Sequence, residues 1–206
     1  NRSKQAILAI SEIPTLHDMY RSRKLLQRDQ SFAPSDAHNR IISFCYYDIT
    51  RMKVDAVVNS ANNSLKVSKN SSTLSYHIHK AGGPSFTKEA ESKGRLKSGQ
   101  AALTGGHNLP CTYVIHAARP QYGPNESMGQ FNVLTECYRS ALRIALDSGF
   151  RTVALPCLGA GGCGFPPRVA ARIALQEVRE YLDFHKQHPF ERIIFVVQSV
   201  SDEKAY

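Results

Sequence analysis

The segment 152–197 limits the possible folds of this 206-residue chain more than any other part of it. It reads as an apolar strand over Thr152–Leu158, a glycine-rich loop over Gly159–Phe165, a helix opened by proline over Pro166–Phe184 and a buried strand over Arg192–Val197. Two strands joined through a helix form a parallel pair, and parallel strands are buried on both faces. The sequence therefore predicts an α/β fold.

The other apolar runs continue this alternation. Strands are predicted over Ile41–Tyr47, Ala56–Asn59, Ala101–Thr104 and Tyr113–Ala117, and helices over Ser75–Ala81, Pro84–Ser92 and Gln130–Asp147. Earlier in the chain, helical spacing covers Ile13–Gln27, and a loop is expected over Ser31–Asn39. We expect residues 1–40 to form a helical extension packed on one domain of residues 41–206.

Composition narrows the class of protein. With 42% hydrophobic and 21% charged residues the chain is typical of globular proteins, and its apolar runs are too short to cross a bilayer. Its polar start lacks the shape of a signal peptide. The five cysteines form no CxxC motif, so the sequence indicates neither a disulfide framework nor a thiolate zinc site. We expect a soluble intracellular monomer without a metal or cofactor.

The formal net charge of +9 favours anionic partners, although a solvated basic surface explains it equally well. The densest basic group is Arg21, Arg23, Lys24 and Arg28, and it has no interleaved aromatic residues on which bases could stack. Nucleic-acid binding is therefore a minor hypothesis, which a steep dependence of affinity on salt would support.

The loop Gly159-Ala160-Gly161-Gly162-Cys163-Gly164 matches the pattern G-x-G-x-x-G between a strand and a helix. Glycines let backbone amides approach a pyrophosphate, and the following helix supplies its positive end. A plain strand-to-helix turn is the alternative. A Rossmann site fits poorly, because its loop follows the first strand and an acidic residue lies about 20 positions later at a strand end. Here that position falls on Glu180, inside the predicted helix.

Four stretches of this sequence resemble motifs of the macrodomain family, and they are most similar to those of its MacroD type. They are Tyr47–Thr50, Val54–Asn62, Ser98–Ala101 continued through Leu109–Pro110 to Tyr113–His116, and Leu155–Gly161 continued to Gly164–Pro166. The resemblance runs from about residue 41 to residue 197. It implies a three-layer α/β/α sandwich with a mixed, largely parallel central sheet and ADP-ribose lying across the strand ends.

The resemblance also implies a set of ligand-binding residues. They are Asp48, Ile49, Ala61, Asn62, Thr73, Leu74, Ser75, Gly159, Ala160, Gly161, Gly162, Cys163, Gly164 and Phe165. Asp48 would accept a hydrogen bond from the adenine amino group, Asn62 would hold the distal ribose, and the glycine loop would cradle the diphosphate. As alternatives, Asp48 caps a turn and Asn62 bonds its own backbone.

One loop departs from the family pattern. Hydrolytic MacroD-type members carry G-G-G-V-D-G before an I-H-x-A-A-G stretch, whereas this chain has a glycine-free segment, Lys66–His77, three residues longer. Ser75 stands where the family has its aspartate, and no acidic residue occurs between Ala56 and Lys88. A serine hydroxyl cannot act as a general base at neutral pH. Loss of a general base typically lowers the reaction rate by about 10²- to 10⁴-fold.

The candidate catalytic residues that remain are Asn62, as a positioning group, and His77, because the ordinary histidine pKa lies near neutrality. A surface role for His77 is the competing interpretation. Two more departures are Cys163, where many relatives have an aromatic residue, and Arg119, which replaces a glycine and could add a phosphate contact.

We expect a reader of free ADP-ribose or of mono-ADP-ribosylated protein, with weak or absent hydrolysis. The alternative is a mono-ADP-ribosyl-protein hydrolase or O-acetyl-ADP-ribose deacetylase that works by positioning its substrate. Binding of poly-ADP-ribose through the basic surface is a third, weaker hypothesis.

Overall fold

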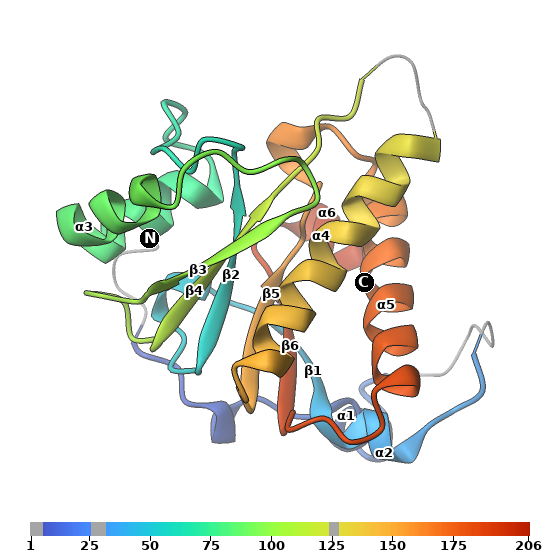
Figure 1. The fold of residues 1–206 in the computed structure, drawn as a ribbon. Coiled ribbons are helices and arrows are strands. Elements are labelled where there is room, and N and C mark those ends of the chain that lie inside the picture. The colour runs from blue at the N-terminus through green and yellow to red at the C-terminus, as the bar shows by residue number, and fades with distance from the viewer. Residues whose placement is uncertain (1–5, 26–31, 124–127) are drawn as a thin grey trace.

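A computed structural model describes residues 6–25, 32–123 and 128–206. Six strands form one sheet in the order β1-β6-β5-β2-β4-β3 (Figure 1). They are β1 (Ile42–Tyr46), β2 (Ala56–Ala61), β3 (Ala101–Gly105), β4 (Tyr113–Ala118), β5 (Thr152–Pro156) and β6 (Arg192–Val197). Only the β3–β4 pair of this sheet is antiparallel. The predicted mixed, largely parallel sheet is confirmed.

Successive residues of the central strands face two different cores. In β2, Ala56 and Val58 belong to one apolar cluster and Val57 to the other. In β6, Ile193 lies in the first cluster and Ile194 in the second. Because side chains alternate between the faces of a strand, an apolar sequence without alternation needs cover on both sides.

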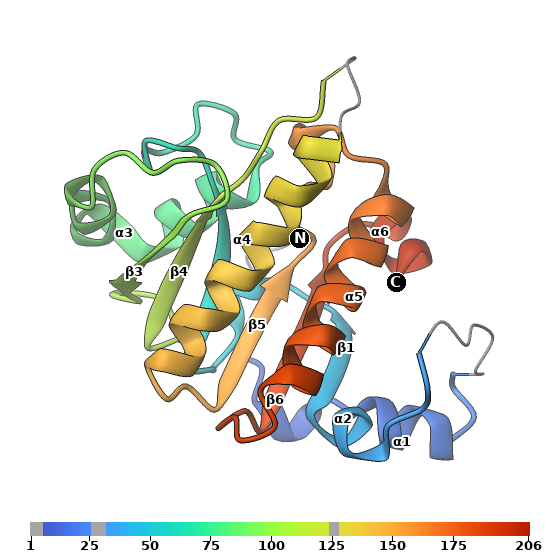
Figure 2. The same cartoon turned by 45° about the vertical axis from the view of Figure 1, so that its right-hand side comes forward.

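Helices supply that cover, which completes the predicted three layers (Figures 1 and 2). On one face α4 (Met128–Asp147) and α5 (Pro167–Phe184) lie side by side, and the short α6 (Val200–Ala205) packs against α5. On the other face lies α3 (Leu74–Ser92), which packs on β2 and β3. No helix in the described ranges is both long enough and apolar enough to cross a membrane.

Helix α3 is bent at Gly83, which agrees with the two separate helices that the sequence predicts, Ser75–Ala81 and Pro84–Ser92. Gly83 has φ 83° and ψ −176°, far from helical values. A Cβ there would lie 2.7 Å from the side-chain nitrogen of Asn108, so the position requires glycine on two grounds. Proline then opens the second half, because a first-turn residue needs no N–H donor.

The first helix is shorter than predicted. The spacing over Ile13–Gln27 predicted one long helix, but α1 covers Leu16–Arg21, and Gln27 lies outside the described residues. Thr15 caps its start, accepting a hydrogen bond from the amide of Asp18 at 3.1 Å. Arg23 then adopts a left-handed φ of 57°, which no α-helix accommodates.

The predicted loop Ser31–Asn39 was also wrong in part, because α2 (Asp36–Ile41) occupies its second half. Ser35 caps this helix through the amide of His38 at 3.3 Å. The ring of His17 in α1 meets the carboxylate of Asp36 at 2.6 Å, which joins the two short helices. The domain boundary at residue 40 stays a prediction.

Candidate functional site

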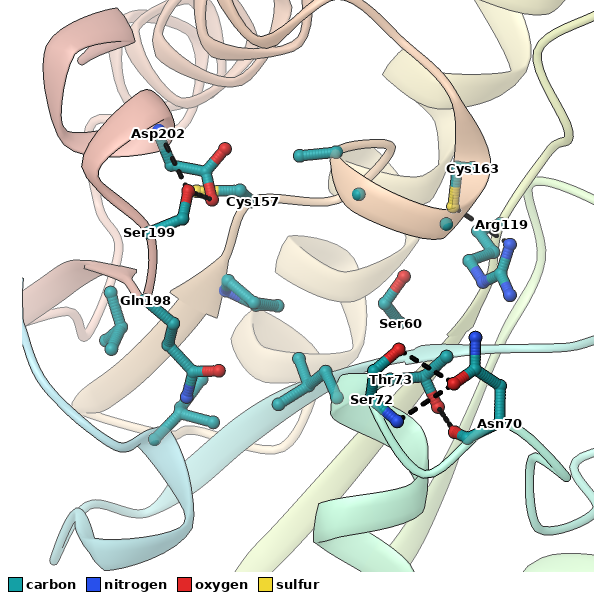
Figure 3. A pocket seen from close by; sticks show the side chains of 17 residues that line it. Ser60, Asn70, Ser72, Thr73, Arg119, Cys157, Cys163, Gln198, Ser199 and Asp202 are labelled. Carbon is teal, nitrogen blue, oxygen red and sulfur yellow. Dashed lines mark hydrogen bonds between the residues drawn. The ribbon is translucent and has the colours of Figure 1, made fainter. Parts of the chain in front are cut away.

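A cavity of about 260 Å³ opens at the carboxyl edge of the sheet, where ligands bind in open α/β folds (Figure 3). Its walls come from the carboxyl ends of parallel strands, from the segments that follow them and from the loop before α3. The lining residues are Ile49, Ser60, Asn70, Ser72, Thr73, Leu74, Arg119, Pro156, Cys157, Ala160, Gly161, Gly162, Cys163, Val196, Gln198, Ser199 and Asp202.

The glycine loop after β5 forms one side of this cavity. Gly159, Gly161 and Gly164 adopt φ values of 85°, 65° and 83°, a left-handed conformation that L side chains rarely adopt. A Cβ added at Gly161 or Gly162 would meet no atom within 4 Å, so the backbone there is open to a ligand. The turn therefore requires glycine at several positions, and its backbone borders the cavity.

The loop before α3 forms the facing side and holds itself in shape. The side-chain oxygen of Asn70 accepts from the amide of Ser72 at 2.9 Å and from its hydroxyl at 2.7 Å. Thr73 caps α3 through the amide of Tyr76 at 3.3 Å. The positive end of a long helix thus borders the cavity opposite the glycine loop.

Asn62 does not line the cavity. Its side-chain oxygen accepts from the amide of Ser64 at 3.1 Å and from that of Lys66 at 3.3 Å, and its nitrogen donates to the Lys66 carbonyl at 2.8 Å. The amide group therefore shapes the turn after β2, which is the alternative that the sequence left open. A role in ligand binding stays a prediction that would require these bonds to exchange.

Asp48 shows the same local use of its side chain. One carboxylate oxygen accepts from the amide of Thr50 at 3.0 Å and from its hydroxyl at 2.7 Å, which caps the turn Ile49–Arg51. Asp48 is 9% exposed, and its neighbour Ile49 lines the cavity. The carboxylate thus lies beside the site, and its contact with a ligand stays a prediction.

The structure brings half of the predicted binding residues into the cavity wall. The lining includes Ile49, Thr73, Leu74, Ala160, Gly161, Gly162 and Cys163. The residues that do not line it are Asp48, Ala61, Asn62, Ser75, Gly159, Gly164 and Phe165. His77, the candidate base, does not line it either; its ring packs edge-on against Tyr76 in α3 at 5.6 Å.

Sequence reasoning missed the wall that follows β6. Gln198, Ser199 and Asp202 line the cavity, and the last two belong to the start of α6. Ser199 caps this helix, accepting from the amide of Asp202 at 3.1 Å and donating to its carboxylate at 2.6 Å. A serine followed three residues later by an acidic residue is a helix-start signal, so the sequence did carry the information.

Charge is concentrated at two places in the lining. Arg119 and Asp202 are the only Lys, Arg, Asp or Glu side chains among the described lining residues, and Figure 3 shows them on opposite sides. Burial raises the pKa of the Cys157 thiol to about 12. Burial also raises the pKa of Cys163, although Arg119 acts against it. Both thiols are therefore neutral at pH 7.

A buried polar cluster lies behind the loop before α3. Asn59 donates to the Nδ1 atom of His116 at 3.2 Å, and the Nε2 atom of His116 lies 3.0 Å from the Thr104 hydroxyl. Burial lowers the pKa of His116 to about 3, so the ring is neutral. Within the described ranges, His, Cys, Asp and Glu side chains form no group of three that could hold a metal ion.

Comparisons with known proteins agree on one family. The Macro domain model matches residues 58–174, more than half of the chain. The chain is 35% identical to the ADP-ribose glycohydrolase MACROD2 of Xenopus laevis over 97% of its length and 47% of the relative's. It is 33% identical to MACROD1 of Bos taurus over 96% of its length and 59% of the relative's. It thus spans about half the length of these relatives.

Solved structures give the same result. The Trypanosoma brucei macrodomain in complex with ADP-ribose aligns with a TM-score of 0.78 and 28% identity, over 98% of this chain and 75% of the other. The macro domain of ganglioside induced differentiation associated protein 2 aligns with a TM-score of 0.84 over 97% and 92% of the two chains. At 24% identity, that second likeness concerns the fold alone.

Proposed function

Since the chain belongs to the macrodomain family, we propose that it is a reader of ADP-ribose. It recognises free ADP-ribose, or the terminal ADP-ribose unit on a modified protein, with little or no hydrolysis. The cavity at the carboxyl edge supports binding, because the glycine loop and the start of α3 border it on opposite sides, and such segments can offer backbone amides. Such amides at a helix start and a glycine loop suit a diphosphate.

The proposed lack of hydrolysis rests on the distribution of carboxylates around the cavity. Asp202 is the only carboxylate among the described lining residues, and its side chain already accepts a hydrogen bond from Ser199 at 2.6 Å. Asn70, Ser72 and Thr73 form the wall at the start of α3, opposite it in Figure 3. Neutral amides and hydroxyls can orient a water but cannot take its proton at pH 7.

We expect the protein to bind ADP-ribose without releasing it from mono-ADP-ribosylated protein. Isothermal titration measures the first property, and chromatography of released ADP-ribose over several hours measures the second. Absence of binding at high micromolar ADP-ribose would refute the proposed function as a reader. Release at a rate comparable to that of an active family member would refute the loss of hydrolysis.

The second candidate function is hydrolysis of mono-ADP-ribosyl groups or of O-acetyl-ADP-ribose. It is favoured by the names of the relatives, which are ADP-ribose glycohydrolases. In this case catalysis rests on positioning, with Asn62 orienting the ribose or a water. Release that persists in His77→Ala and vanishes in Asn62→Ala, at unchanged affinity for ADP-ribose, would identify this mechanism.

Asp48→Asn tests recognition of the adenine amino group. Asparagine keeps an oxygen for the bonds from Thr50, but its nitrogen cannot accept a hydrogen bond. Loss of a charge-assisted bond should weaken ADP-ribose binding by about 10- to 100-fold in a titration. Asp55→Asn is the control, because Asp55 precedes β2 at the opposite edge of the sheet and bonds the amide of Thr152 at 2.9 Å. Equal affinities of Asp48→Asn and wild type would contradict the assignment.

A further inference from the structure

Arg119 is fastened to the end of the glycine loop. Its amide donates to the Ala61 carbonyl at 3.1 Å, and its Nη1 atom donates to the Sγ atom of Cys163 at 2.9 Å. The same segment is tied to the loop a second time, because the Tyr122 amide donates to the Cys163 carbonyl at 2.8 Å. The half-buried guanidinium therefore has a defined position beside the loop amides.

The charge of Arg119 is not compensated by the residues that the structure describes. None of the ion pairs found among them includes this side chain. Its partner Cys163 is a neutral thiol, because burial raises the pKa of Cys163. The lining carboxylate of Asp202 lies on the other side of the cavity (Figure 3). The cavity wall thus presents one fixed cation with no ion-pair partner among the described residues.

The direction of the glycine loop indicates which part of a ligand this cation meets. The segment runs from Cys157, near Ser199 and Asp202, to Cys163, beside Arg119 (Figure 3). With the base recognised by Asp48, as the proposed function has it, the base lies beside Ile49, and the phosphate attached to the nucleoside lies near the start of the loop. The second phosphate then lies near its end, within reach of the guanidinium.

We propose that Arg119 is a specificity-determining residue, which pairs with the second phosphate of a bound adenosine diphosphate and so makes the cavity select diphosphates over monophosphates. This inference rests on the proposed function. Arginine suits the role because its planar group offers several donors to phosphate oxygens while one N–H stays on Cys163.

The test compares AMP, ADP and ADP-ribose as ligands of the wild type and of Arg119→Gln by isothermal titration. Loss of a half-buried charged hydrogen bond should weaken ADP and ADP-ribose by about 10- to 100-fold and AMP by less than about threefold. Arg119→Lys should recover part of the loss, because it keeps the charge. Raising the salt concentration should weaken ADP-ribose binding to the wild type more than to Arg119→Gln.

Arg151→Gln serves as the matched control for loss of a positive charge. Arg151 directly precedes β5 at the edge of the sheet away from the cavity and pairs with Glu191. We expect this variant to bind all three nucleotides as the wild type does. Equal losses for AMP and ADP-ribose in Arg119→Gln would mean that Arg119 only supports the loop, and would overturn the inference. A wild type that binds none of the nucleotides would instead refute the proposed function.

Discussion

Replacing Gly162 with glutamate should weaken ADP-ribose binding by at least about 100-fold, because repulsion between like charges amounts to several kcal/mol. Gly162 lines the cavity, and a Cβ there meets no atom within 4 Å. Its φ lies outside the left-handed range, so a side chain causes no backbone strain. The new carboxylate can therefore extend over the cavity without disturbing the fold. Titration with ADP-ribose measures the loss.

Thermal unfolding separates this effect from damage to the protein. The melting temperatures of Gly162→Glu and wild type should agree within a few degrees. Gly162→Ala is the matched variant, and we expect a loss of only a few-fold, because a methyl group adds neither charge nor much volume. If Gly162→Glu binds within threefold of wild type, the loop does not hold the diphosphate.

Acidification from pH 7 to pH 5 should lower the free energy of unfolding by about 2 kcal/mol through His116 alone. Asn59 donates to Nδ1, so this atom is an acceptor, and the network assigns the proton to Nε2, facing Thr104. A second proton would place a buried charge against an amide donor. Burial accordingly holds the pKa of His116 at about 3.

The free energy of unfolding falls on acidification because the pKa of His116 is lower in the folded protein than in the unfolded chain. The unfolded chain has an ordinary histidine pKa of about 6.5, so it binds more protons than the folded protein at any pH between about 3 and 6.5. The stabilisation is complete above pH 6.5 and falls by up to about 1.4 kcal/mol for each pH unit below it. Burial lowers the pKa of His79 in the same direction, which adds to the loss.

Urea unfolding at pH 7 and pH 5 measures this difference. His116→Gln should be less stable than wild type at pH 7 but should show a smaller difference between the two pH values. His185→Asn, at the end of α5, should keep the wild-type difference. An identical pH dependence in wild type and His116→Gln would exclude His116 as its source.

The sequence predicted the strands well because their apolar runs are bounded by clear breaks. For β6 the prediction and the structure agree at both ends, Arg192 and Val197. The short α1 and α2 were mispredicted, because six residues carry too little periodicity and their limits depend on caps. The missed α6 had only the Ser199 cap as its signal, and the cavity wall at Asp202 was missed with it.

The sequence predicted the part of the candidate site that depends on backbone conformation. It did not predict the part where a polar side chain can bond either a ligand or the nearby backbone. Several glycines between a strand and a helix indicate a turn with left-handed backbone positions that other residues rarely adopt, so the loop at Gly161 and Gly162 was identified from sequence. Asp48 and Asn62 are short polar side chains that can serve a ligand or their own backbone. The structure shows both bonding to nearby backbone, a choice that depends on the local turn.

The loop before α3 has its turn closed by Asn70 and its helix capped by Thr73, through hydrogen bonds within the loop itself. A rim of this kind loses little conformational entropy on association, so most of its contact energy can appear as affinity. Binding should then require little rearrangement of this loop. The sequence predicts that this loop is longer than its MacroD counterpart. Ordering of the extra residues by their own side chains during folding would keep the entropic cost of ligand binding small.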